Sequence, residues 1–162
     1  MLGFEEDLKS FVSTIDLKKD SISTEETTKI SLILPFIQLL GYDITNLSEV
    51  QAEYAADMGV KKNEKIDLAI MMDDNPEIII ECKLFNSVLA HDQISQLYRY
   101  FNVTSCKLCI LTNGDNYKIY TDICQANTMD DRPFLDIILS MITDKWIHKL
   151  IIFNGKTFDL IG

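Results

Sequence analysis

Three charged residues lie within or at the end of apolar runs in one segment of the chain. Residues 65–83 read KIDLAIMMDDNPEIIIECK, with Asp67 near the start and Glu81 and Lys83 at the end. An ionised group inside an apolar strand costs several kcal/mol unless it is paired or bound to a metal ion, so charges at these positions require a reason. Carboxylates that bind a divalent ion, with an ammonium group beside them, are the parts of a metal-dependent catalytic site.

The same segment predicts two strands that bring these charges together. The apolar runs at 65–72 and 77–83 are joined by DDNP at 73–76, which favours a turn. Because side chains alternate along a strand, the glutamate and the lysine of the second strand share a face. A loop of odd length then places Asp67 opposite them on that face. We therefore expect two carboxylates and one ammonium group to meet at one point.

This arrangement, Asp67 followed by Glu81-x-Lys83 after a short hairpin, resembles the signature of the PD-(D/E)XK nuclease superfamily. The surrounding sequence is similar to one branch, the N-terminal nuclease domain of the R (restriction) subunit of type I restriction enzymes. Glu-x-Lys alone occurs by chance in most chains, so the hairpin and a later Gln-x-x-x-Tyr motif carry the resemblance together. The similarity spans roughly residues 20–140, in TEETTKISLILPFIQLLGYD (24–43), KKNEKIDLAI (61–70), IIIECK (78–83), QLYRYF (96–101) and LTNGDNYKIYTD (111–122).

The resemblance implies an α/β fold with a restriction-endonuclease-like three-layer core, in which a central mixed β-sheet is flanked by helices. It also implies a Mg²⁺-dependent DNA endonuclease, with Mn²⁺ as a substitute ion, that leaves a 5′-phosphate and a 3′-hydroxyl. Such a site contacts the phosphodiester backbone and not the base edges, so it has no sequence specificity of its own. In type I systems a separate subunit recognises DNA, and we therefore expect other restriction-modification subunits among the partners.

Each residue at the end of the hairpin has an expected role within this resemblance. Asp67 and Glu81, with the main-chain carbonyl of Cys82, would supply oxygen ligands to Mg²⁺. Lys83 would hold the attacking water or stabilise the negative charge of the transition state.

A helix predicted over residues 87–102 carries the second motif, Gln96-x-x-x-Tyr100, whose side chains lie one turn apart. We expect the amide and the phenol beside the metal centre, where they would orient Lys83 or a substrate phosphate. The alternative is an amphipathic helix with glutamine and tyrosine at its border and no catalytic role. The position of the motif directly after the Glu-x-Lys strand favours function.

A longer helix is predicted from residues 23–24 to Gly41, with a kink or local break at Pro35. Polar residues occupy its first turn and apolar residues the rest. The inward face is expected to be Ile30, Ile33, Ile37 and Leu40.

The first turn of this helix contains a further candidate carboxylate. In the R-subunit family a helix at this place supplies an extra active-site glutamate, and we prefer Glu26 to Glu25 because Glu26 lies one turn before the inward face. Ser23-x-x-Glu26 also fits a capping box, in which the glutamate only satisfies a helix-terminal N–H group. Both interpretations stay open.

The remaining pattern completes a single domain, residues 1–162. A loop at 57–64 holds Lys61 and Lys62, with Lys65 just beyond it; these could meet phosphates, although a lysine-rich loop is more often a solvated turn. The other expected elements are an N-terminal helix (3–19), a strand (49–56), a hairpin (107–112 and 117–122), a last helix (133–148) and an apolar tail (150–158), with the core at 23–123 and the C-terminal helix and tail at 133–162.

Cys106-x-x-Cys109 is the single CxxC pair among four cysteines. A zinc site would need two more ligands at matching spacing. The pair also lies in a predicted strand, where residues i and i+3 point to opposite faces. We therefore favour buried, reduced cysteines over a metal or redox pair, which fits a cytoplasmic protein.

The formal net charge of −10 bears directly on nucleic-acid binding. A protein that grips DNA by itself is usually basic, so either a partner holds the DNA or binding is weak and metal-dependent. No apolar run reaches membrane-spanning length and the N-terminus, MLGFEEDLKS, is unlike a signal peptide, so we expect a soluble cytoplasmic protein with no membrane partner. The chain has no G-x-x-x-x-G-K-[ST] motif, and we expect a stand-alone relative without the helicase motor of R subunits.

Two other functions stay open beside the nuclease. The acidic charge would suit a catalytically idle module that uses the nuclease fold to bind a protein partner such as a restriction complex. A purely structural acidic domain, in which Asp67 and Lys83 form a buried pair, is the third alternative.

Overall fold

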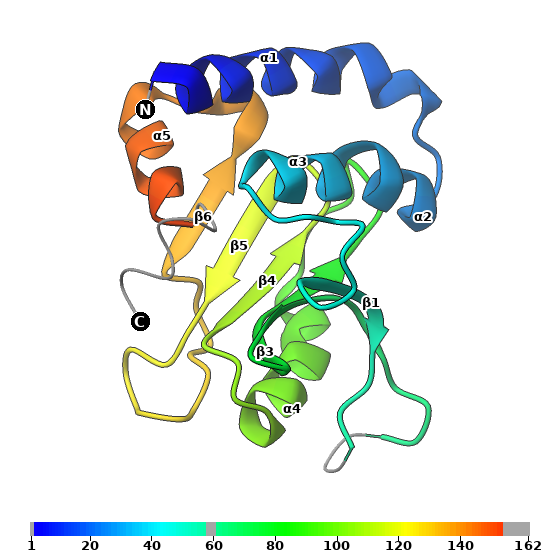
Figure 1. Cartoon of the computed structure of the whole chain (residues 1–162), viewed down its shortest axis with the longest axis vertical. Helices are drawn as coiled ribbons and strands as arrows, with labels where there is room; N and C mark the ends of the chain where they lie inside the picture. The colour runs from blue at the N-terminus through cyan, green and yellow to red at the C-terminus, as the bar shows by residue number, and fades with distance from the viewer. Residues whose placement is uncertain (1, 58–60, 154–162) are drawn as a thin grey trace.

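The computed structural model describes residues 2–57 and 61–153, which fold around one mixed sheet (Figure 1). The six strands follow one another across the sheet in chain order. Neighbours are antiparallel except for β3 and β4, which are parallel. The strands are β1 (Val50–Tyr54), β2 (Ile66–Met72), β3 (Asn75–Cys82), β4 (Leu108–Thr112), β5 (Asn116–Tyr120) and β6 (Leu135–Ile138).

Helices cover both faces of this sheet, so the expected three-layer α/β architecture is confirmed. The parallel step from β3 to β4 needs a crossover, and it carries the short helix η3 (His91–Ile94) and then α4 (Ser95–Val103) across one face. The other face carries α1 (Leu2–Lys18), α3 (Leu34–Leu39) and α5 (Asp144–Leu150) (Figure 1).

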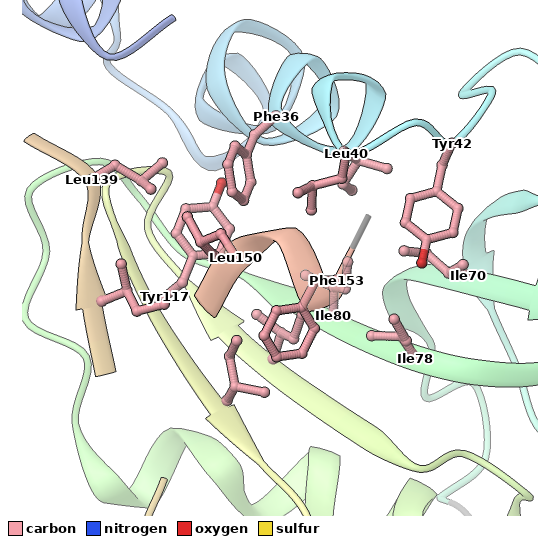
Figure 2. Close-up of a pocket in the computed structure, with 14 residues that line it drawn as sticks. Phe36, Leu40, Tyr42, Ile70, Ile78, Ile80, Tyr117, Leu139, Leu150 and Phe153 are labelled. Atoms are coloured by element: carbon pink, nitrogen blue, oxygen red, sulfur yellow. The ribbon is translucent and has the colours of Figure 1, made fainter. Parts of the chain in front are cut away.

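The two faces have separate apolar cores because side chains alternate along the strands. On β3, Ile78 and Ile80 belong to the core beneath α1 and α3, whereas Ile79 packs with Leu97 and Tyr100 of α4. Within the first core lies a narrow apolar cavity of about 30 Å³, which Figure 2 shows between the sheet, α3 and α5. Its walls are almost wholly apolar, so it reads as a packing gap in the core.

The segment after α1 is interrupted near Pro35, as predicted. It comprises α2 (Glu25–Thr28), a π-helical turn η2 (Lys29–Ile33) and α3, with Pro35 in the first turn of α3. Proline has no N–H group to bond the carbonyl four residues earlier. That carbonyl, on Ser31, accepts a hydrogen bond from Lys18 Nζ at 3.1 Å instead.

The π turn also changes which residues of this segment face inward. The predicted inward residues Ile33, Ile37 and Leu40 are buried, but Ile30 is 57% exposed, and Leu32 is buried in its place. A π turn holds more residues than an α turn, so the buried face N-terminal to it is rotated relative to a regular helix. The prediction for Ile30 was wrong for this reason.

The C-terminal region differs most from expectation. The first half of the helix predicted over 133–148 is β6, which pairs antiparallel with β5. Strand β5 offers an open edge, and its ladder hydrogen bonds outweigh the helical pattern of an apolar segment. The second half holds the short helix η4 (Leu139–Met141) and α5. The tail predicted over 150–158 begins with the last residue of α5 and continues as η5 (Ile151–Phe153), and residues 154–158 lie outside the described residues.

Elsewhere the expected elements are present with shifted ends. The N-terminal helix, the strand at 50–54 and the hairpin of β4 and β5 are confirmed, and the helix predicted over 87–102 begins later, at residue 91. No helix among the described residues is long and apolar enough to cross a membrane.

Candidate functional site

The hairpin of β2 and β3 places Asp67 and Glu81 by means of a β-bulge. Its turn has two residues, Asp73 and Asp74, with φ of 48° and 63°, and not the four predicted. The register then slips by one residue between Ile70 and Met71. We predicted that a loop of odd length would set this register, but the one extra residue is supplied by the bulge.

Beyond the bulge the register brings the two carboxylates face to face. Leu68 pairs with Ile80, so one further step along both strands sets Asp67 opposite Glu81. Without the bulge, Asp67 would stand opposite Ile80 and its side chain would point to the other face. The predicted convergence therefore depends on one inserted residue.

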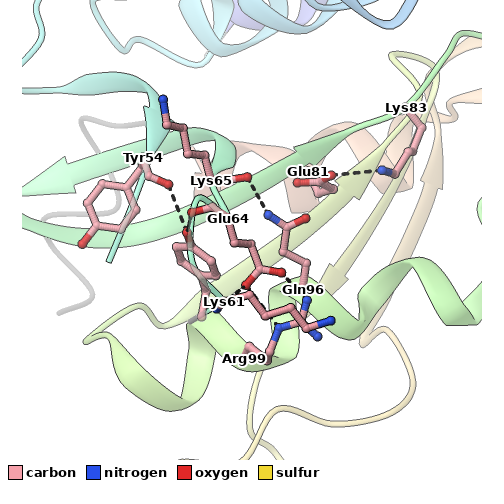
Figure 3. A network of polar contacts seen from close by, with 9 residues as sticks. Tyr54, Lys61, Glu64, Lys65, Glu81, Lys83, Gln96 and Arg99 are labelled. Carbon is pink, nitrogen blue, oxygen red and sulfur yellow. Dashed lines mark hydrogen bonds and ion pairs between the residues drawn. The ribbon is translucent and has the colours of Figure 1, made fainter. Parts of the chain in front are cut away.

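Asp67, Glu81 and Lys83 meet at the ends of the two strands. Asp67 Oδ2 accepts a hydrogen bond from the Cys82 N–H group at 2.7 Å. Lys83 Nζ donates to Glu81 Oε1 at 3.0 Å, which Figure 3 shows at the end of β3. The peptide group of Lys83 is also fixed, because its N–H group donates to the Thr112 carbonyl of β4 at 2.8 Å.

The electrostatics of the site centre on Glu81, whose side chain is 10% exposed. Burial, followed by the negative charge of Asp67, raises the pKa of Glu81 from 4.5 to about 7, although Lys83 acts in the opposite direction. Burial alone would lower the pKa of Lys83, but the hydrogen bond and the charge of Glu81 outweigh it and raise that pKa. A buried carboxylate facing another carboxylate is stabilised by any cation that binds between them.

The donor atoms fit a hard divalent ion. Glu81 Oε1 accepts from Lys83, whereas Glu81 Oε2 is buried and, within the described part of the chain, accepts no hydrogen bond. No group of three or more His, Cys, Asp or Glu side chains among the described residues could hold an ion. The set is thus two carboxylates, to be completed by main-chain, water or phosphate oxygens, which suits Mg²⁺ better than zinc.

Gln96 and Tyr100 lie close to this site but bind the backbone that leads into it. Gln96 Nε2 donates to the Lys65 carbonyl at 2.5 Å, and the Tyr100 hydroxyl donates to the Glu64 carbonyl at 2.7 Å (Figure 3). The expected contact of this motif with Lys83 is therefore absent among the described hydrogen bonds. The motif instead fixes the two residues that precede β2 and so positions Asp67.

A side-chain ion pair strengthens the same support. Arg99 of α4 binds Glu64 through two nitrogens, and its hydrogen bond lowers the pKa of Glu64. Because Arg99 and Tyr100 grip the same loop residue from one helix, α4 and the start of β2 form one unit.

The structure does not show the capping box that was the alternative role for Glu26. Thr24 is the N-cap, and Thr27 completes the capping box, so neither Ser23 nor Glu26 has that role. Glu26 Oε2 lies 2.9 Å from Lys29 Nζ, whereas Glu25 is the helix carboxylate whose charge acts on Glu81 and Lys83. The catalytic role expected for Glu26 stays a prediction, as does that of Glu25.

Two residues of this segment were missed by the sequence argument. Thr28 is fully buried, and its Oγ1 accepts a hydrogen bond from the Phe85 N–H group at 3.0 Å, which ties α2 to the chain after β3. Lys29 is part-buried and close enough to Asp67 for that charge to contribute to its raised pKa. The signal in the sequence was its position three residues after Glu26, a spacing at which oppositely charged side chains meet on a helix.

The remaining candidates lie away from the site or on its surface. Lys61, Lys62 and Lys65 are exposed, and their contact with phosphates stays a prediction. Cys106 and Cys109 are buried, as predicted, but both belong to the core beneath α4, so the expectation of opposite faces was wrong. Cys106 precedes β4 and does not follow the alternation of the strand.

Fold and site together define a class of protein. The structure is an α/β protein with a restriction-endonuclease-like three-layer core, and one end of its central hairpin carries two carboxylates and a lysine. The family described as type I restriction enzyme R protein N terminus (HSDR_N) matches residues 24–133. The chain belongs to this family, which indicates a restriction-related nuclease role. No curated protein and no solved structure matched the chain.

Proposed function

We propose that this domain hydrolyses phosphodiester bonds of DNA with the help of Mg²⁺, or Mn²⁺ in its place, as a PD-(D/E)XK nuclease. The observation that carries the proposal is the Glu81 carboxylate. It is buried, it lies opposite Asp67 in the hairpin, and one of its oxygens is bound by Lys83 while the other accepts no hydrogen bond from the described residues.

The residues divide the chemistry among them. Asp67 and Glu81, with the Cys82 carbonyl, would hold the ion, and Glu25 would add negative charge from α2. A bound divalent ion lowers the pKa of water and offsets the charge that forms on the phosphate. Lys83 would donate a hydrogen bond to the attacking water or to a non-bridging oxygen while the water oxygen bonds to phosphorus and the P–O3′ bond breaks. The products would be a 5′-phosphate and a 3′-hydroxyl.

The negative net charge of the domain affects how it binds DNA. With a net charge of −10, the domain has little electrostatic attraction for DNA. We propose that the domain alone binds DNA weakly and with the help of the metal ion, and that a DNA-binding partner, such as another restriction-modification subunit, increases its access to the substrate. The site would then cleave without sequence specificity of its own, because it contacts the backbone and not the bases.

Cleavage of plasmid DNA tests the proposal most directly. The wild-type domain, with Mg²⁺ and separately with Mn²⁺, should convert supercoiled plasmid to nicked and linear forms, whereas Asp67→Ala, Glu81→Ala and Lys83→Ala should not. Circular dichroism should show that the three variants keep the fold. Full activity in the variant that carries all three substitutions would contradict the proposal.

The acidic charge also favours a second candidate, the catalytically idle module that binds a protein partner. Calorimetric titration with Mg²⁺ and Mn²⁺ separates the two functions. A nuclease should bind the ion at Asp67 and Glu81 and lose that binding in Asp67→Ala, whereas an idle module has no need to bind metal there.

A further inference from the structure

A groove lies between α2, η2 and the strands β1 and β2. It has a volume of about 350 Å³, and one of its walls includes Leu68, the neighbour of Asp67 in β2. Most of the lining is apolar, and the polar groups come from Glu26, Lys29 and Glu53. Of the described residues that line it, Lys29 is the only cationic one.

The π turn is what positions Lys29 in this groove. Lys29 is its first residue, and its side chain is 15% exposed. Inserted π turns of this kind occur often at functional sites, where they reorient a side chain. The long stem is held against the protein while the ammonium group, 2.9 Å from Glu26 Oε2, remains at the groove.

Charge links Lys29 to the metal ligands. Burial, the largest single influence, acts to lower the pKa of Lys29, but the hydrogen bond that Lys29 donates to Glu26 and the charge of Asp67 outweigh it and raise that pKa. Lys29 therefore stays protonated. Its ammonium group has an exposed partner, Glu26, and it also feels the charge of Asp67, the proposed metal ligand.

The opposite wall of the groove carries backbone strain at Glu53. The pairs Ala52–Leu68 and Tyr54–Ile66 bracket it, so Glu53 stands at the position opposite Asp67. Its φ is 52°, a left-handed conformation that is uncommon for a residue with a side chain. Strain of this kind gathers at functional sites, and here it lies within β1, opposite the proposed metal ligand Asp67.

We propose that Lys29 is a phosphate-binding residue of the nuclease: when DNA engages Asp67 and Glu81, Lys29 Nζ exchanges the Glu26 carboxylate for a phosphate oxygen of the same strand in the groove. The inference rests on the proposed function. The exchange costs little, because the Glu26 side chain is 65% exposed and surface ion pairs contribute little to stability. Glu26 acts as an internal competitor that occupies the ammonium group until a phosphate arrives.

DNA affinity measured by fluorescence anisotropy, with Ca²⁺ in place of Mg²⁺ to prevent cleavage, tests the exchange. Lys29→Ala should weaken binding of a short DNA duplex about tenfold, and Lys29→Arg should restore most of it, since both cations bind phosphate. Glu26→Gln should tighten binding about threefold, because the competitor is gone while Lys29 remains.

Lys19→Ala is the matched control. Lys19 also belongs to an i,i+3 ion pair, with Asp16 at 2.6 Å, and its loss changes the net charge by the same amount. Affinity should change less than twofold in this variant. Calorimetry with Mg²⁺ adds a second readout, since removal of a cation near Asp67 should leave metal affinity equal or higher, whereas damage to the fold would lower it.

The outcomes separate this inference from the function on which it rests. If wild-type protein cleaves DNA and Lys29→Ala binds DNA as Lys19→Ala does, the inference is wrong and the proposed function stands. If wild-type protein neither cleaves nor binds DNA, the proposed function fails and the inference with it. Should Lys29→Ala unfold, Glu26→Gln decides, because unchanged or weaker DNA binding in that variant contradicts the exchange.

Discussion

Strand β3 carries a buried glutamate near each of its ends, and only one of them belongs to the candidate site. Glu77 and Glu81 are both buried, and each lies close to a lysine, with Nζ–Oε distances of 2.9 Å to Lys107 and 3.0 Å to Lys83. The Lys107 side chain is 60% exposed, whereas that of Lys83 is 21% exposed. Each end of β3 thus carries a buried glutamate paired with a lysine, but the two pairs differ in their surroundings.

The difference lies in the neighbouring strand. Glu81 faces Asp67 across the hairpin, and this second negative charge contributes to raising its pKa to about 7. Glu77 is the residue that the bulge inserts into β3: it stands between Ile78, which pairs with Ile70, and Pro76, which pairs with Met71, and it has no carboxylate opposite it in β2. A buried glutamate with a lysine is therefore a structural pair at one end and a candidate metal ligand at the other.

The largest expected effect is on catalysis. Glu81→Gln should reduce the rate of plasmid cleavage on the order of a thousandfold, because an uncharged amide is a poor ligand for Mg²⁺. Glu77→Gln, an identical substitution on the same strand, should change the rate less than threefold. Equal losses in the two variants would show that β3 needs both charges for folding and would remove the distinction between its ends.

The pH dependence of stability should also differ between the two variants. The pKa of Glu81 is raised by folding from 4.5 to about 7, so its contribution is fully present below pH 4.5 and is lost as the pH rises to about 7. The loss amounts to about 3 kcal/mol. Urea unfolding between pH 4.5 and 8, without divalent ions, should show this decline in wild type and in Glu77→Gln, and a flatter profile in Glu81→Gln. A flat wild-type profile would contradict the raised pKa.

A smaller effect is expected from the support that α4 gives to the site end of the hairpin. Tyr100→Phe removes the hydrogen bond to the Glu64 carbonyl and should lower the free energy of unfolding by about 1–2 kcal/mol. The cleavage rate should fall several-fold, because Asp67 is then held less firmly. Tyr98→Phe on the same helix is the control, and a similar loss in both variants would argue against a positioning role for Tyr100.

The smallest effect is expected at the turn beside Glu77. Both turn residues have positive φ, which Asn-Gly adopts more readily than Asp-Asp. The double substitution Asp73→Asn and Asp74→Gly should therefore raise the free energy of unfolding by about 0.5–1 kcal/mol, measured in urea, and leave the cleavage rate unchanged. A changed rate would show that the two ends of the hairpin are coupled through the bulge.

Local sequence patterns predicted the hairpin of β2 and β3 and the convergence of Asp67, Glu81 and Lys83. They did so because the alternation of side chains is a property of each strand by itself. They did not predict the bulge, in which Glu77 of β3 has no partner opposite Ile70 and Met71, because the pairing between two strands is not a property of either strand alone. The predicted meeting of Asp67 and Glu81 was right, but it was attributed to the length of the turn and not to a bulge.

Other errors have the same origin. The segment that became β6 has helical spacing, and it is a strand because β5 offers an edge that no local window contains. The role of Tyr100 was misplaced because its partner is the carbonyl of a loop 36 residues earlier in the chain.

The sequence by itself determined the donor set of this protein, two carboxylates and a lysine on a short hairpin, because residue types and strand alternation are local properties. The tertiary structure decided which of the buried glutamates of β3 lies opposite a second carboxylate, and it placed Lys29 near enough to Asp67 for that charge to act on it. These depend on a bulge, a π turn and burial between two helical layers, and burial is what raises the pKa of Glu81. Dielectric surroundings and charge proximity are properties of the folded neighbourhood, so they appear only when the chain has packed.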